Sequence, residues 1–210
     1  MAEDGAPAHV WRFVLGFSLI AIAYQIGAHL FGATDYVGVD LDDSMRLVEV
    51  RDFLAGQGWF DLHQYRLGPP GGTLMHWSRL IDAPIAALIA LFSLVVSPPM
   101  AEVAGLFVWP LLLIVPLMAA LAVAAYRVGG RQAMMLALIL ALLYLCAIPR
   151  FRPGAIDHHN VQLVLATVIT AMLLDPRARA SSFAAAAVAC GLALAIGVET
   201  TPLVAVAAMA

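Results

Sequence analysis

The chain has 210 residues, of which 63% are hydrophobic and 12% charged, and its mean hydropathy is +0.92. Soluble domains average about 45–50% apolar and about 25% charged residues, so a soluble protein of this composition would expose large apolar patches and aggregate. All basic residues are arginines, and no basic run indicates a nucleic acid partner. The composition therefore predicts an all-α protein whose helices cross a lipid bilayer several times.

Five apolar stretches approach the roughly 20 residues that a membrane-spanning helix needs. They cover residues 13–31, 102–126, 133–149, 159–175 and 182–198. A sixth apolar stretch, 81–96, has Asp82 and Pro84 near its start and is shorter, which suits an interfacial or re-entrant helix as well as a span. We therefore expect a polytopic transmembrane helix bundle whose long first loop, residues 32–101, contains interfacial helices.

The arginines in short loops predict how the chain is oriented. Two short loops, 127–131 and 177–179, each carry two arginines. If both are cytoplasmic, and if the sixth apolar stretch does not cross, the loop 32–101 and the segment 150–160 share the outer face of the plasma membrane. That face then holds six arginines, which an anionic ligand would explain. The apolar run at the C-terminus further predicts that the protein continues beyond Ala210.

An acidic cluster, Asp40-Leu41-Asp42-Asp43, follows the first apolar stretch. Carboxylates this close repel one another, and a bound divalent cation relieves the repulsion. A weak apolar stripe after the cluster predicts a helix over 44–58. The alternative interpretation is therefore that the same carboxylates cap the N-terminus of that helix.

A second polar cluster lies at the mouth of an apolar helix. Its members are Arg150, Arg152, Asp157, His158, His159 and Asn160. Carboxylate and imidazole groups are standard ligands for Mg²⁺, Mn²⁺ or Zn²⁺, and ionisable residues at the end of a membrane helix indicate a functional site. Helix capping would account for Asp157 but not for the two histidines. The cluster therefore predicts a metal or substrate site.

A third polar stretch starts with the Pro/Gly-rich loop 65–72 and leads into His76, Trp77 and Arg79. The prolines and glycines mark a loop, and Trp77 suits a membrane interface. An interfacial hairpin without a ligand is the alternative. The isolated residues His29, His63 and Glu199 are expected to be structural.

In this order, the elements resemble the N-terminal half of the catalytic subunit of oligosaccharyltransferases, in its archaeal and bacterial branch, within the GT-C membrane glycosyltransferases. The resemblance covers about residues 13–174. It rests on the outward Asp42, on Val48-Glu49-Val50-Arg51-Asp52-Phe53-Leu54, on His76-Trp77 and Leu80-Ile81-Asp82 after the Pro/Gly loop, and on Asp157-His158-His159.

The resemblance implies roles for the polar residues. Asp42 and Asp157 would bind a divalent metal, Mn²⁺ or Mg²⁺, with His159 in the second acidic position of an Asp-x-Asp motif, and Arg150 would serve the active site. We assign substrate contacts to a further set: Asp43, His158, Arg152, His76, Trp77 and Arg79. The implied reaction moves a sugar or oligosaccharide from a polyprenyl-(pyro)phosphate donor to a protein, lipid or polysaccharide acceptor. A transporter or flippase of a lipid-linked or polar substrate is the alternative.

Overall fold

The structure is a computed structural model that describes residues 8–38 and 40–209. Helix makes up 72% of it, which confirms the all-α prediction. The β-structure of the described residues is a two-residue antiparallel ladder between β1 (His63–Gln64) and β2 (Thr73–Leu74). This ladder closes the Pro/Gly-rich loop that the sequence predicted.

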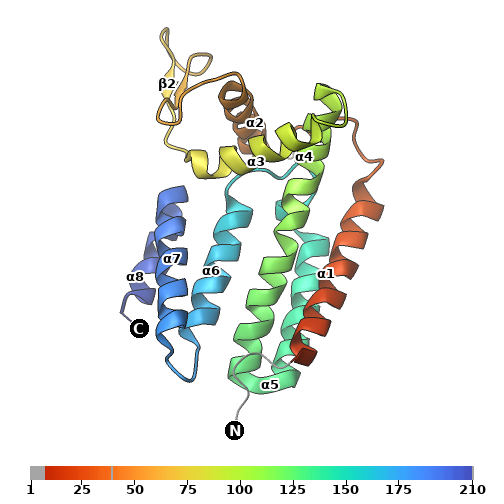
Figure 1. The fold of residues 1–210 in the computed structure, drawn as a ribbon, viewed down its shortest axis with the longest axis vertical. Helices are drawn as coiled ribbons and strands as arrows, with labels where there is room; N and C mark the ends of the chain where they lie inside the picture. Colours follow the sequence, from red (N-terminus) through yellow and green to blue (C-terminus); the bar gives the residue numbers. More distant parts are fainter. Residues whose placement is uncertain (1–7, 39, 210) are drawn as a thin grey trace.

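Most of the helices form a bundle and run side by side along the longest axis of the molecule (Figure 1). They are α1 (Ala8–His29), α4 (Pro98–Leu112), α5 (Ile114–Ala147), α6 (His159–Leu173), α7 (Ala180–Ile196) and the short α8 (Thr201–Ala207). Each of the five apolar stretches expected from hydropathy corresponds to helix in this set, with ends that differ by a few residues.

Helix α5 contains a sharp reversal at Gly129 and Gly130. The backbone leaves the helical region at both residues, and Gly130 has φ +64° and ψ −154°, a conformation open to glycine but not to residues with a Cβ. The chain turns back here (Figure 1), and the arms before and after the turn share one apolar core through side chains such as Leu117 and Leu138.

By length and composition, two described stretches are apolar and long enough to cross a membrane, His9–His29 and Pro98–Ala147. The second stretch includes the reversal in α5, so it consists of two antiparallel arms. Three further apolar helical stretches are shorter, at His159–Leu173, Ala180–Ile196 and Val198–Ala207.

One end of the bundle is covered by polar and amphipathic elements. Helix α2 (Leu41–Leu54) and helix α3 (Arg79–Phe92) lie there, and α3 runs across the bundle rather than along it (Figure 1). Gly105 of α4 lets α3 approach closely, because a Cβ at this position would meet Ile89 Cγ1 at 2.6 Å. The apolar stretch 81–96 therefore forms a helix that does not run parallel to the long helices.

The segment between α5 and α6 reaches the same end of the bundle. It contains the 3₁₀ turn Pro149–Phe151, and Gly154 N donates a 2.9 Å hydrogen bond to Leu106 O of α4. Phe151 and Ile156 are fully buried, which anchors the segment in two apolar cores. The two polar stretches 32–101 and 150–160 thus lie at one end of the bundle, as the orientation argument required.

Candidate functional site

The first turn of α2 is closed by a capping box. Asp40 is the N-cap residue, and its side chain accepts a 3.0 Å hydrogen bond from Asp43 N, while Asp43 Oδ2 accepts one of 3.1 Å from Asp40 N. The helix therefore begins at residue 41, three residues before the expected start at Ser44. This arrangement leaves Asp42 exposed to solvent.

Asp43, rather than Asp42, connects the acidic cluster to the second polar cluster. Its Oδ1 accepts hydrogen bonds from Ile156 N at 2.7 Å and from Asp157 N at 2.8 Å. The carboxylate of Asp43 thus fixes the backbone that presents Asp157. The assignment of Asp42 as a metal ligand finds no support in this geometry, because Asp42 neither lines the cavity described below nor belongs to the described His/Asp group.

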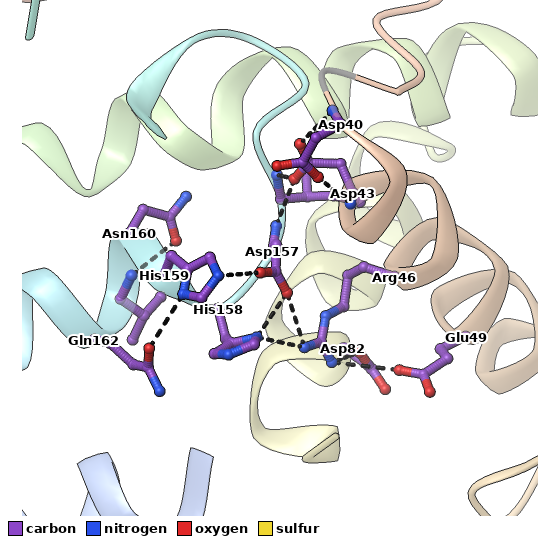
Figure 2. A network of polar contacts seen from close by, with 12 residues as sticks. Asp40, Asp43, Arg46, Glu49, Asp82, Asp157, His158, His159, Asn160 and Gln162 are labelled. Atoms are coloured by element: carbon purple, nitrogen blue, oxygen red, sulfur yellow. Dashed lines mark hydrogen bonds and ion pairs between the residues drawn. The ribbon is translucent and has the colours of Figure 1, made fainter. Parts of the chain in front are cut away.

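Behind the site lies a buried ion cluster, which surrounds Arg46. The fully buried guanidinium of Arg46 contacts Asp82 Oδ1 at 2.9 Å, Glu49 Oε2 at 3.3 Å and Asp157 Oδ1 at 3.3 Å (Figure 2). It also lies over the ring of Trp77, 4.5 Å from the centroid. Arg46 therefore connects Asp157 to the core beneath α2 and α3, a connection that was not predicted from the sequence.

Arg79 is part of the same cluster and is not available to a substrate. It is buried, and its terminal nitrogens donate to Asp82 Oδ2 at 3.0 Å, to the Glu49 carbonyl at 3.0 Å, to Gln57 Oε1 at 2.6 Å and to the Asp61 carbonyl at 2.7 Å. The predicted substrate contact of Arg79 is therefore wrong, because its donors bind the protein itself and its role is structural.

Trp77 and His76 also differ from their assigned roles. Trp77 is buried between the Arg46 guanidinium and the His158 ring, whose centroid is 6.0 Å from its own, so it packs behind His158 inside the fold rather than lying exposed as a membrane anchor. His76 is exposed, and its described ring contact is with Trp77. The burial of Trp77 leaves little of it for a substrate, whereas the substrate contact of the exposed His76 stays a prediction.

Asp157, His158 and His159 form the one described group of three side chains that could hold a metal ion. Their ligand atoms lie within 4.8 Å of one another. His158 Nδ1 is 2.6 Å from Asp157 Oδ1, and His159 Nε2 is 3.3 Å from Asp157 Oδ2 (Figure 2). Asp157 Oδ2 and His158 Nε2 are buried without a hydrogen-bond partner in the described chain. Buried polar atoms without partners are rare, and an ion is one explanation for them.

Burial and neighbouring charges act in opposite directions on the carboxylates. Burial would raise the pKa of Asp157, but the hydrogen bond and charge of His158, a backbone N–H and the Arg46 charge lower it to about 2. For Asp43, burial outweighs its backbone hydrogen bonds and, with the Asp40 charge, raises the pKa to about 6. Asp157 is therefore an anion at neutral pH, which suits a cation ligand.

A cavity of about 280 Å³ opens next to this group. Its lining residues are Asp40, Asp43, Ile148, Pro149, Arg150, Ala155, Asp157, His159 and Asn160. Arg150 forms an ion pair of 3.4 Å with Asp40 Oδ2, and both side chains are partly exposed. Arg152, two residues on, is exposed and does not line the cavity. The structure thus brings Arg150, Asp157, His159 and Asp43 together, but not Asp42 or Arg152.

Most of the arginines at this end pair with carboxylates of the chain itself. Besides the cluster of Arg46 and Arg79, the described pairs are Arg51 with Glu102 at 2.6 Å, Arg66 with Asp52 at 3.3 Å and Arg150 with Asp40. Five of the six arginines therefore have an internal partner. An anionic ligand is not needed to explain their number, although Arg150 at the cavity is placed to meet one.

A residue that the sequence argument set aside, Glu199, also reaches the site. Its Oε1 is 3.6 Å from His158 Nε2, and its Oε2 accepts a 2.9 Å hydrogen bond from Gln162 Nε2. Gln162 Oε1 lies 3.4 Å from His159 Nδ1. Glu199, Gln162, His159, Asp157 and His158 thus form a closed ring of side chains. Nothing local in the sequence around residue 199 indicates this.

No protein-family model matches the chain, and neither a curated protein nor a solved structure matches it. The resemblance to oligosaccharyltransferases therefore remains an expectation. The geometry of the site is the basis on which a function can be proposed.

Proposed function

We propose that the protein is a polytopic membrane glycosyltransferase of the GT-C type. It transfers a sugar or oligosaccharide from a polyprenyl-(pyro)phosphate donor to an acceptor at the outer face of the plasma membrane. The single observation that supports this most is the Asp157-His158-His159 group, because it combines unpartnered ligand atoms with a cavity at the polar end of an apolar helix bundle.

The exterior of the bundle supports a membrane location. Large apolar side chains on α1, α5 and α7 are exposed along the length of the helices. Examples are Leu15, Leu19, Ile20, Leu136, Leu140, Leu143, Phe183 and Val188. Soluble proteins rarely expose contiguous apolar surface of this extent, whereas lipid is its natural solvent. The five helical stretches along the long axis would then be the spans, with α2 and α3 at the interface.

The position of the site suits a lipid-linked donor. The isoprenoid tail of such a donor lies in the bilayer and its phosphate and sugar lie at the interface, so the site must adjoin the ends of apolar helices. The described cavity lies where α5 ends and α6 begins, and it is lined both by apolar residues such as Ile148 and by Arg150. An arginine suits the phosphate because its guanidinium donates two parallel hydrogen bonds.

The donor set fits a divalent metal. Asp157 Oδ2, His158 Nε2 and His159 are the groups that would hold Mn²⁺ or Mg²⁺, and the first two are buried atoms in need of a partner. When bound, such an ion acts as a Lewis acid toward a phosphate oxygen. The chain itself orients these groups: Asp43 fixes the backbone of Asp157, and Arg46 fixes its Oδ1. Arg150 adds positive charge where the leaving phosphate would develop negative charge.

A transporter or flippase is the competing proposal. Transporters place ionisable groups near the middle of the bilayer, where broken helices line the substrate path. Here the described ionisable groups with unpartnered atoms lie at one end of the bundle, which favours a transferase.

The experiment is donor turnover by the protein in proteoliposomes with a polyprenyl-linked sugar. We expect release of polyprenyl (pyro)phosphate that depends on Mn²⁺ or Mg²⁺, stops with EDTA and returns when metal is added. Asp157→Asn should lower turnover on the order of 100-fold or more, since it removes a charged ligand.

Asp42→Asn is the matched comparison, because it removes the same charge from the exposed side of the adjacent helix. We expect it to keep turnover within about twofold of the original protein, in line with the small effects of exposed substitutions. Turnover that is indifferent to EDTA and to Asp157→Asn would overturn the proposal. Transmembrane movement of the donor without its cleavage would favour the transporter.

A further inference from the structure

Glu199 faces the nitrogen of His158 that has no hydrogen-bond partner in the described chain. The two closest atoms, Glu199 Oε1 and His158 Nε2, are 3.6 Å apart, beyond hydrogen-bond length, and Nε2 is buried without a partner in the described chain. Two ligands that each lie about 2.1 Å from one ion are separated by roughly 3 to 3.5 Å. The separation is therefore close to that of two ligands of a shared cation.

The rest of the His158 ring is prepared for such a role. Its Nδ1 lies 2.6 Å from Asp157 Oδ1 and 3.2 Å from a terminal nitrogen of Arg46; because the carboxylate is an acceptor and its contact is the shorter, that contact places the proton on Nδ1. In the neutral ring, Nε2 then keeps its lone pair for a ligand. A histidine that donates one N–H to a carboxylate and offers its other nitrogen is the usual arrangement of a metal-binding histidine.

The side chain of Glu199 is oriented by two neighbours. Gln162 donates to its Oε2 at 2.9 Å, so Oε1 is the oxygen that faces His158. Gly197 leaves room for this arrangement, because a Cβ there would meet Glu199 Oε2 at 2.2 Å and Gln162 Nε2 at 2.7 Å. The backbone at Gly197 is extended, so space rather than conformation requires the glycine. Among the described residues, His158 is the ion-pair partner of Glu199, and no arginine is.

We propose that Glu199 is a further carboxylate ligand of the cation bound by Asp157, His158 and His159. Glu199 lies between α7 and α8, so it would bring a ligand from a distant segment to a site that otherwise consists of three consecutive residues. This inference rests on the proposed function, since it takes the Asp157-His158-His159 group to be a divalent cation site. It goes beyond that function by adding a ligand from a separate segment, 40 positions after His159.

The test is Mn²⁺ binding to the purified protein in detergent, followed by electron paramagnetic resonance of free Mn²⁺, so that it needs no sugar donor. We expect Glu199→Gln to weaken Mn²⁺ binding at least about tenfold. Gly197→Ala should weaken it too, because it displaces the carboxylate while leaving its charge in place. Glu102→Gln, which removes an equal charge from the same end of the bundle but from outside the site, should bind Mn²⁺ like the original protein.

Asp157→Asn distinguishes a failure of the cation site from a failure of the role of Glu199. If the original protein does not bind Mn²⁺, or if Asp157→Asn binds it equally well, the proposed function loses its metal and this inference falls with it. If Asp157→Asn abolishes binding but Glu199→Gln keeps the original affinity, the cation site stands and the role of Glu199 is overturned, whatever Gly197→Ala shows. Thermal unfolding of each variant verifies that it is folded.

Discussion

Two groups of charged side chains lie next to each other at the polar end of this protein, and they differ in how their charges are satisfied. In the ion cluster around Arg46 and Arg79, each guanidinium is buried and contacts at least one carboxylate, so the charges pair within the chain, although Arg46 Nε, Arg79 Nε and Glu49 Oε1 lack a hydrogen-bond partner in the described chain. In the group around Asp157, His158 and His159, two buried polar atoms have no hydrogen-bond partner in the described chain, and a cavity lies beside them. Asp157 belongs to both groups, since Oδ1 faces Arg46 and Oδ2 faces His159.

The difference separates structural charges from functional ones. A guanidinium paired with buried carboxylates fixes the geometry of its neighbours, and because its N–H groups only donate, it cannot bind a cation. A buried ligand atom without a partner is unfavourable unless something else binds it. The number of arginines at this end predicted an anionic ligand, but five of the six pair with carboxylates of the chain itself.

The largest effect on stability is expected from breaking the ion cluster. Asp82 accepts from Arg46 at 2.9 Å and from Arg79 at 3.0 Å, and all three side chains are buried. Asp82→Asn leaves two buried guanidiniums short of negative charge, and we expect it to lower the free energy of unfolding by about 3–5 kcal/mol. Unfolding by denaturant in detergent measures this. A change below about 1 kcal/mol would mean that the ion cluster contributes little to the stability of the fold.

A smaller effect with the opposite sign is expected at Glu49. Burial and the Asp82 charge raise the pKa of Glu49 from 4.5 to about 7. The folded state therefore holds this proton more tightly than the unfolded state, so the stabilisation is complete below about pH 4.5 and is lost as the pH rises toward 7. Glu49→Gln keeps the neutral form at every pH.

We therefore expect Glu49→Gln and the original protein to be equally stable near pH 5. Near pH 8 the variant should be more stable, by on the order of 2 kcal/mol. Unfolding at both pH values measures the difference. A variant that is destabilised equally at both would indicate that Glu49 is needed as an anion in the cluster.

The smallest effect on stability, combined with a large effect on binding, is expected at His159. Its side chain is 35% exposed and lies at the cavity. His159→Gln should change the free energy of unfolding by no more than about 0.5 kcal/mol, yet lower Mn²⁺ affinity on the order of 10- to 100-fold. Parallel unfolding and Mn²⁺ titrations measure the two quantities. If His159→Gln lowered the stability but kept the Mn²⁺ affinity, His159 would have a structural role and would not be a metal ligand.

The helices could be predicted from the sequence because long apolar stretches have few other stable forms. For the apolar stretch 81–96 the sequence left an interfacial helix and a span open, and α3 runs across the bundle rather than along it (Figure 1). The exact start of α2 was not predicted, although the spacing of Asp40 and Asp43 has the form of a capping box. That signal would have shown Asp43 turned toward the site and Asp42 turned away.

The contents of the site were only partly predictable. Asp157, His158 and His159 are consecutive, so the sequence alone places them together. Arg46 and Glu199 come from other segments, and their contacts with Asp157 and His158 depend on tertiary packing that no local pattern records. Arg79 was misassigned for the same reason, because its partners Gln57 and Asp61 lie 22 and 18 residues away.

The proposed function requires that the two polar segments, 32–101 and 150–160, share the outer face of a membrane. Labelling with a membrane-impermeant maleimide tests it in cells, using Asp42→Cys, Arg152→Cys and Ala178→Cys, each in a Cys146→Ser, Cys190→Ser background. All three positions are exposed, and residue 178 lies in the loop at the far end of the bundle. If the two segments share the outer face, Asp42→Cys and Arg152→Cys react from outside, and Ala178→Cys reacts only after permeabilisation. Labelling of the first two from opposite faces, or of all three from outside, would contradict it.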